Sequence, residues 1–248
     1  MGDNMKKTLL LLTFLAVAGM SSNSAQAATH YVSGFGGISW MQNVDASYIN
    51  TTSVFNFHEN VDLGSGLALT GAIGCDYGNY RLEAEVGYQT NDLKSSGEDI
   101  SGIAQTWPTN AAGTTTTTRQ AMRGDVSVLS LMGNGYYDFD LGSKVELYAT
   151  AGVGVAQVTG HNVNHVTDIS SGPPYTFTAN PDPGFNAHAT TLAWQVGAGL
   201  AAPIADNVKL DLRYRYFATT DFTSFMFGAP FNANVSSHSV LLGLRVDF

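Results

Sequence analysis

The sequence predicts an all-β protein, an eight-stranded antiparallel up-and-down transmembrane β-barrel. Three observations lead to this fold class: segments in which apolar and polar residues alternate, connections that are alternately long and short, and an N-terminal export signal. Alternation with a period of two residues indicates β-strands. Membrane-spanning barrels join such strands by long loops on the outer side and short turns on the periplasmic side. A secreted β-sandwich has no reason to alternate its connections in this way, so a barrel is favoured.

The first 27 residues have the layout of a signal peptide. Lys6 and Lys7 precede an apolar run over residues 8–20, and a polar stretch then leads into Ala25-Gln26-Ala27. Because Ala25 and Ala27 form the small-x-small pattern of a cleavage site, we expect cleavage after Ala27. An apolar run of about 13 residues is too short to span a bilayer comfortably. The expected domains are therefore a signal peptide (1–27) and one outer-membrane β-barrel (28–248).

The composition excludes several classes of function. Hydrophobic residues make up 44% of the 248 residues and charged residues only 12%, which excludes ordinary disorder. The net charge of -9 comes without a basic tract, so we expect no nucleic-acid partner. Cys75 is the only cysteine. It can therefore form neither an intrachain disulfide nor a thiolate zinc cluster.

The mature chain contains eight candidate strands, most of them long enough for a tilted strand to cross a bilayer. Their expected bounds are residues 30–41, 64–77, 80–91, 122–138, 144–158, 188–202, 207–218 and 237–248. The short connections are residues 78–79, 139–143 and 203–206. The four long connections, expected to be extracellular loops, are centred on residues 43–61, 92–120, 159–187 and 219–236. An even number of strands puts both termini at the periplasmic side.

Two of these strands, over residues 80–89 and 208–216, carry charged residues on one face. The charged residues are Arg81, Glu83, Glu85, Lys209, Asp211, Arg213 and Arg215. The two strands are expected on opposite walls of a lumen that is only wide enough for side chains to fill it. The two glutamates should then meet Arg213 and Arg215 across the lumen. Because buried charges persist only when paired, this network is predicted to be a structural plug, and the alternative is a gated ion path.

The opposite faces of the strands are apolar and end in aromatic residues, as expected for a surface that meets lipid. The residues expected to form two interfacial girdles are Trp40, Tyr80, Tyr88, Trp194, Tyr214, Tyr216 and Phe248. Cys75 falls on this face and should behave as a small apolar residue. The chain ends in VLLGLRVDF, and a terminal aromatic such as Phe248 is typical of barrels inserted by the outer-membrane assembly machinery.

Several segments resemble a known family. They are VSGFGG, YRLEAEVGYQ, GNGYYDFDLGSK, AGVGVA, the hairpin AWQVGAGLAAPIADNVKLDLRYRYF and the terminal phenylalanine. Together with the signal peptide, they are similar to the porin-like, eight-stranded surface-antigen and opacity-protein barrels of the outer membrane. A more distant similarity is to the transmembrane half of outer-membrane protein A. The resemblance covers essentially all of the mature chain, and it implies a surface antigen, an adhesion role or a role in envelope integrity.

Function is therefore expected in the long loops rather than in a catalytic site. A narrow pore for ions or small solutes is the alternative, and a lipid A-modifying enzyme is a third hypothesis. For such an enzyme the sequence offers Ser237-His238-Ser239. His238 should face outward and its serine neighbours inward, which prevents the hydrogen bond between nucleophile and base.

We expect no catalytic, cofactor-binding or metal site. The residues His161, His165, Asp168 and His188 lie in or beside the third long connection, but they lack the short fixed spacing of metal ligands. The expected partners are outer-membrane lipid and lipopolysaccharide, the outer-membrane assembly machinery, and host or surface ligands. The expected location is a Gram-negative outer membrane.

Overall fold

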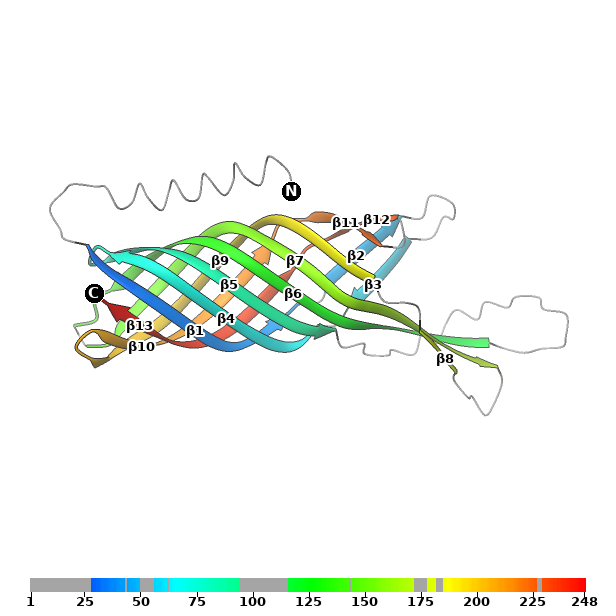
Figure 1. The fold of residues 1–248 in the computed structure, drawn as a ribbon, viewed down its shortest axis with the longest axis horizontal. Helices are drawn as coiled ribbons and strands as arrows, with labels where there is room; N and C mark the ends of the chain where they lie inside the picture. Colours follow the sequence, from blue (N-terminus) through cyan, green and yellow to red (C-terminus); the bar gives the residue numbers. More distant parts are fainter. Residues whose placement is uncertain are drawn as a thin grey trace.

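The computed structural model describes residues 28–42, 44–49, 56–61, 63–93, 116–142, 144–171, 178–181, 185–226 and 229–248. Eight strands form a closed antiparallel barrel, which confirms the predicted fold class (Figure 1). They are β1 (Thr29–Met41), β4 (Leu63–Asp76), β5 (Tyr80–Leu93), β6 (Thr116–Phe139), β7 (Glu146–Ser171), β9 (Phe185–Ala205), β10 (Val208–Thr219) and β13 (Ser236–Asp247). Each strand pairs with the next barrel strand along the chain, and β1 pairs with β13 to complete the circle.

The two ends of the barrel differ. At one end, which we call the short-turn end, tight turns join β4 to β5, β6 to β7 and β9 to β10. The amide of Phe248 donates a hydrogen bond to the carbonyl of His30 (2.8 Å), so both termini of the barrel also lie at this end. At the opposite end, the long-hairpin end, β6 and β7 stay paired beyond the barrel as far as Thr116 and Ser171 (Figure 1).

Two of the short turns are built in the same way, from an aspartate followed two residues later by a glycine. Asp76 Oδ1 accepts a hydrogen bond from the amide of Gly78 (2.8 Å), and Asp140 Oδ1 accepts one from the amide of Gly142 (2.9 Å). Gly78 and Gly142 have φ values of 92° and 62°, a region that favours glycine. The sequence therefore specifies these turns locally.

The third short turn lies later than the sequence predicts. It was expected over residues 203–206, whereas β9 continues to Ala205 and the turn consists of Asp206 and Asn207. Pro203, which the sequence predicts in the turn, lies in the strand. The pairing of β7 with β9 ends at Ala201, so the proline occupies a stretch of β9 that β7 no longer borders. Proline is tolerated where one side of a strand needs no backbone donor.

Parts of the predicted loops form additional strands. In residues 43–61 and 219–236 these are β2 (Val44–Ile49), β3 (Asn56–Val61), β11 (Phe222–Met226) and β12 (Ala229–Ala233). They make a second, four-stranded sheet in the order β11-β12-β2-β3. A further strand, β8 (Thr178–Pro181), pairs with the extension of β7. The first and last long connections leave the barrel from the neighbouring strands β1 and β13, and this proximity allows their hairpins to pair.

Glycines on the inner wall make room for tyrosine rings. The ring of Tyr31 lies against Gly74 of β4, and the ring of Tyr148 lies against Gly199 of β9; a Cβ atom at either glycine would overlap the ring. The rings can therefore lie close along the barrel wall and help to fill a narrow lumen. No helix long and apolar enough to cross a membrane occurs in the described part of the chain.

Candidate functional site

The barrel has an inverted distribution of polarity, with charged side chains inside and apolar side chains outside. On β10, Arg213 is 2% exposed, whereas its neighbours Leu212 and Tyr214 are 48% and 47% exposed. Six of the seven charged residues singled out from the sequence are buried, and the seventh, Lys209, is half-buried. Period-two alternation places all seven on the inner faces of β5 and β10. The interior is therefore the candidate site.

Glu85 lies at the centre of the interior network. Its Oε2 atom is 3.1 Å from Arg213 Nη1, and its Oε1 atom is 3.5 Å from Arg215 Nη1. Gln195 Nε2 of β9 also donates a hydrogen bond to Oε1 (3.2 Å). The structure thus brings together, across the lumen, the glutamate and the two arginines that the sequence placed on opposite walls. Both oxygens of a fully buried carboxylate have cationic or amide partners, as burial of a charge requires.

Glu83, one step closer to the short-turn end, is bound mainly by hydroxyl groups. Tyr136 Oη donates to Oε1 (2.6 Å), while Tyr31 Oη and Ser33 Oγ donate to Oε2 (3.2 and 3.3 Å). Arg213 Nη1 lies 3.9 Å from Oε1. The arginine expected to pair with Glu83 is therefore shared with Glu85, and tyrosine donors complete the site.

Arg81 does not join the two glutamates. It makes a bidentate pair with Asp138 of β6, from Nε to Oδ2 and from Nη2 to Oδ1, both at 2.7 Å. Its guanidinium carbon lies 4.4 Å from the ring centre of Tyr136 and 4.8 Å from that of Tyr148. A planar guanidinium can satisfy a carboxylate and stack on rings at the same time.

Asp211 and Lys209 of β10 also find partners outside the predicted set. Tyr148 Oη donates to Asp211 Oδ1 (2.6 Å). Lys209 bonds to Glu146 at the short-turn end, and its Nζ is 3.7 Å from Asp247 Oδ2. The seven predicted residues therefore do not form one continuous set of charge pairs, since Arg81 and Asp211 contact Tyr136 and Tyr148 and Lys209 pairs separately at the short-turn end.

Several interior residues were missed from the sequence. Arg245 of β13 is 1% exposed, and its Nη2 donates to Glu146 Oε2 (2.8 Å). A signal for it was available, because Arg245 alternates with the outward-facing Leu244 and Val246 in the last strand. Tyr31 gave no such signal, since the first strand has small residues on both faces.

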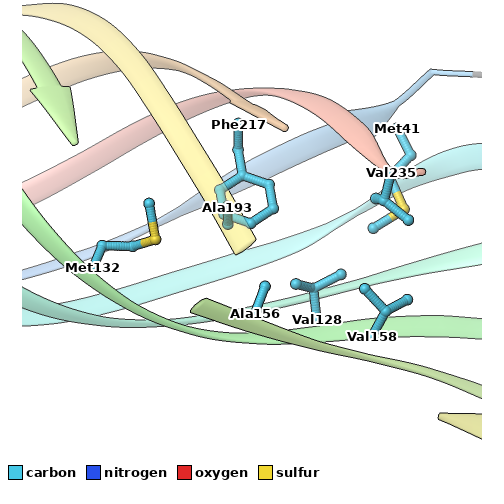
Figure 2. Packing of buried hydrophobic residues seen from close by; sticks show 8 residues of the cluster. All are labelled: Met41, Val128, Met132, Ala156, Val158, Ala193, Phe217 and Val235. Atoms are coloured by element: carbon cyan, nitrogen blue, oxygen red, sulfur yellow. The ribbon is translucent and has the colours of Figure 1, made fainter. Parts of the chain in front are cut away.

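An apolar cluster lies in the lumen toward the long-hairpin end. Its members are Met41, Val128, Met132, Ala156, Val158, Ala193, Phe217 and Val235. Figure 2 shows Phe217, Met41 and Val235 on one side of the cluster, facing Val128, Ala156 and Val158 on the other. We refer to these eight side chains as the apolar cluster. The interior thus changes from polar to apolar along the barrel axis.

The outer surface carries the predicted apolar belt. At the short-turn end, the ring of Tyr137 lies 5.2 Å from that of Tyr80. At the long-hairpin end, the ring of Tyr216 lies 5.4 Å from that of Trp194 and 5.0 Å from that of His238. Aromatic groups at both edges of an exposed apolar band match the interfacial girdles of membrane barrels.

Serine and histidine do not form a catalytic arrangement at the position weighed from the sequence. His238 faces outward, with Nδ1 2.6 Å from Tyr214 Oη, while Ser237 is buried in the lumen. Elsewhere Ser127 Oγ lies 3.1 Å from His161 Nε2, a pair that sequence reasoning missed. No carboxylate hydrogen bond to His161 is found among the described residues. Within the described part of the chain, the pair thus has no third group of the kind that orients a catalytic base.

The remaining predicted positions lie at the ends of the chain. Phe248 is 72% exposed, and its ring centre is 6.3 Å from that of His30. Ala25 and Ala27, the expected cleavage site, lie outside the described residues. Among the described residues, no group of three His, Cys, Asp or Glu side chains gathers as metal ligands.

The chain is similar to known proteins along almost its whole length. The family model described as "Outer membrane protein beta-barrel domain" matches residues 9–248. The candidate adhesin RC1281 of Rickettsia conorii is 27% identical over 202 residues, which cover 77% of this chain and 72% of that protein. The outer membrane protein PagN of Salmonella typhimurium is 25% identical over 213 residues, with 82% and 79% covered. The crystal structure of neisserial surface protein A has 17% identity and a TM-score of 0.46, covering 88% of this chain and 97% of that chain.

Proposed function

The chain belongs to the outer-membrane-protein β-barrel family, and from this membership we propose that it is a non-catalytic adhesion protein of the bacterial surface. The barrel holds the protein in the outer membrane, with its long-hairpin end facing the outside. The sheet β11-β12-β2-β3 and the extended β6–β7 hairpin then make the contacts with surface ligands. In this arrangement the lumen supports the structure and does not itself act on a substrate.

The observation that carries this proposal is the filling of the lumen. Glu85 and Arg213 meet at 3.1 Å in the middle of the barrel, and the apolar cluster occupies the lumen beyond them. An eight-stranded barrel has room inside for little more than its own side chains. A barrel filled in this way is suited to act as a rigid anchor, which leaves the segments outside it as the surface available for binding.

The long-hairpin end supports the same proposal. Two connections that start from neighbouring barrel strands pair with each other through Tyr48 and Phe231, so they form one sheet rather than two independent loops. The β6–β7 hairpin extends further in the same direction (Figure 1). Paired strands offer a preorganised binding surface, which lowers the entropy lost on binding.

The two relatives described above agree with an adhesion role, since one bears the name of an adhesin and both match most of this chain. The expectations that remain belong to the same proposal. Residues 1–27 direct export and are removed after Ala27, Phe248 is the signal for barrel assembly, and both ends of the mature chain face the periplasm.

A binding assay with intact bacteria tests the proposal. A laboratory strain that displays the full chain should adhere to cultured epithelial monolayers more than the same strain with an empty vector. Joining Leu93 to Gly124 by a short Gly-Ser turn removes residues 94–123, including the part of β6 that extends beyond the barrel, and should bring adhesion back toward the vector level. The matched control is an insertion after Leu141, in a short turn, of the same length as the Gly-Ser turn. This insertion should leave adhesion unchanged.

Each variant must first show the heat-dependent gel mobility of a folded barrel. Equal adhesion of the shortened and the full-length protein, at equal surface amounts, would refute a role for residues 94–123. Conductance above background in planar bilayers would instead favour the narrow pore. Altered lipid A in mass spectra of expressing cells would favour the enzyme hypothesis.

A further inference from the structure

The polar part of the lumen contains side-chain atoms that are buried without a hydrogen-bond partner. Eleven such nitrogen and oxygen atoms occur among the described residues, including Arg81 Nη1, Asp211 Oδ2 and Arg245 Nη1. Three of the eleven take part in ion pairs, at distances of 3.4 and 3.5 Å. Native proteins leave few buried polar groups unpaired, and ordered water usually explains those that remain.

The unpartnered atoms lie on one side of the apolar cluster. On β10, which runs away from the short-turn end, Asp211 and Arg215 come before Phe217. On β9, which runs the other way, Gln195 comes after Ala193. On both strands the unpartnered atoms are therefore nearer the short-turn end than the cluster residue is.

Two further strands show the same order. On β7, Thr150 lies nearer the short-turn end than Ala156 does. On β13 and the residue before it, Ser239 and Arg245 lie nearer that end than Val235 does. All four strands that carry both kinds of residue thus agree, and these strands, β13, β10, β9 and β7, are neighbours that make up half of the barrel wall.

Several polar side chains beside the apolar cluster bond to one another, although Gln195, the register partner of Phe217 on β9, keeps an unpartnered Oε1 atom. Gln89 and Ser237 are hydrogen bonded at 3.2 Å, and Ser237 is the register partner of the cluster residue Phe217. Asn91 Oδ1 accepts from Ser39 Oγ (2.9 Å), and Asn91 Nδ2 donates to two backbone carbonyls. These groups have their partners within the protein and need no water.

We propose that the apolar cluster is the barrier to water in the barrel, and that the polar lumen between it and the short-turn end holds bound water admitted from that end. The ligand is water itself, bound by those guanidinium and carboxylate atoms that have no hydrogen-bond partner in the protein. The anchoring role proposed above does not require this division, which concerns where the lumen is sealed.

Physical chemistry favours the apolar cluster over the ion pairs as the barrier. A buried water needs two to four polar partners, which Arg81, Asp211 and Arg245 offer and the cluster does not. Small cavities lined by apolar side chains stay dry, and hydrophobic constrictions close pores by excluding water. The Glu85–Arg213 pair is central, but its atoms can hydrogen bond to water in place of each other for short periods.

Osmotic water permeability of reconstituted lipid vesicles, followed by stopped-flow light scattering, tests this proposal. Wild-type vesicles should be close to protein-free vesicles. The double variant Phe217→Ala/Met132→Ala should raise the permeability clearly above that of both wild-type and protein-free vesicles, because a wider constriction can become wet. The comparison variant Arg213→Gln removes the central charge and should leave permeability near the wild-type value. An unchanged double variant, or an increase in Arg213→Gln as large as in the double variant, would overturn the assignment of the barrier.

A second measurement does not depend on any variant. A crystal structure of the wild-type barrel at a resolution that shows ordered water should place water within hydrogen-bond distance of Asp211 Oδ2 and Arg245 Nη1. The same map should show no water among Phe217, Val128 and Ala156. Water within the cluster, or unhydrated Asp211 and Arg245 atoms, would contradict the proposal.

Discussion

The inner and outer faces of β10 have the same alternating pattern and opposite physical roles. Arg213 is almost fully buried and Leu212, next to it in the chain, is about half exposed. In a water-soluble protein the exposures would be reversed, because the apolar face would form the core. Around this barrel the apolar side chains meet lipid, so they stabilise the protein where they are exposed. Alternation therefore identifies a strand, while the chemistry of each face indicates whether that face meets the lumen or lipid.

The two faces should therefore respond to substitution through different mechanisms. Inside, each charge is held by specific partners at short distances, and loss of one partner leaves another charge buried. Outside, contact with lipid is unspecific, so one apolar residue can replace another with little effect. Four substitutions, taken from the largest expected effect to the smallest, separate these mechanisms.

The largest effect is expected from Arg213→Leu. This change removes the cation that faces Glu83 and Glu85 across the lumen and leaves Glu85 with Arg215 alone, 3.5 Å away. Removal of one partner of a buried ion pair lowers the free energy of unfolding of a protein by about 3–5 kcal/mol. Equilibrium unfolding of the barrel by guanidinium in lipid vesicles measures the change in free energy of unfolding. An unchanged transition would show that the interior pairs do not stabilise the fold.

The change Leu212→Arg, one residue away, tests the outer face. Here a cation is placed against lipid with no carboxylate to meet it. A lipid-facing arginine near the bilayer midplane destabilises the folded barrel by about 2–4 kcal/mol, and one near the interfaces destabilises it less. The same unfolding experiment applies, with Leu212→Met as the control that keeps the face apolar. If Leu212→Arg proved as stable as the control, the face would not lie in the hydrocarbon.

Most of the barrel could be predicted from the sequence, because each of its strands is marked by local features. The turns at Gly78 and Gly142 follow from an aspartate two residues earlier, and alternation sets which residues face inward. The sheet β11-β12-β2-β3 could not be predicted. Its β12–β2 pairing joins Phe231 to Tyr48, residues distant in the chain that are brought together only when β1 and β13 close the barrel.

The sequence predicts which charged residues face the lumen, but it does not predict how all of them pair. Glu85 and Arg213 are expected across from each other, because both strands start from short turns and can be counted from them, and in the structure they lie 3.1 Å apart. Arg81 was assigned to the same network, yet it binds Asp138 on the neighbouring strand. Choosing between a partner on the adjacent strand and one across the lumen requires the tilt of the strands and the space left by rings such as Tyr136, which alternation does not reveal.

A smaller loss is expected from Tyr136→Phe. The change removes the 2.6 Å hydrogen bond from the tyrosine hydroxyl to Glu83 and keeps the ring that stacks on Arg81. A hydrogen bond to a charged group contributes about 1.5–3 kcal/mol, and Tyr31, Ser33 and Arg213 still surround Glu83. Urea or guanidinium unfolding should therefore place this variant between the wild type and Arg213→Leu. A loss as large as that of Arg213→Leu would mean that Glu83, rather than Glu85, is the centre of the network.

The smallest effect is expected from Lys209→Met, which shows where the buried interior ends. Lys209 bonds to Glu146, whose side chain is 32% exposed, and Arg245 remains beside Glu146 when the lysine is lost. Partly exposed pairs contribute about 0–1 kcal/mol because water and salt screen them. The same strand thus carries both extremes, with Arg213 in the middle of the lumen and Lys209 at its short-turn end. If Lys209→Met lost as much free energy of unfolding as Arg213→Leu, and the loss were insensitive to salt, the short-turn end would be as closed to water as the centre. The entry of water proposed there would then be wrong.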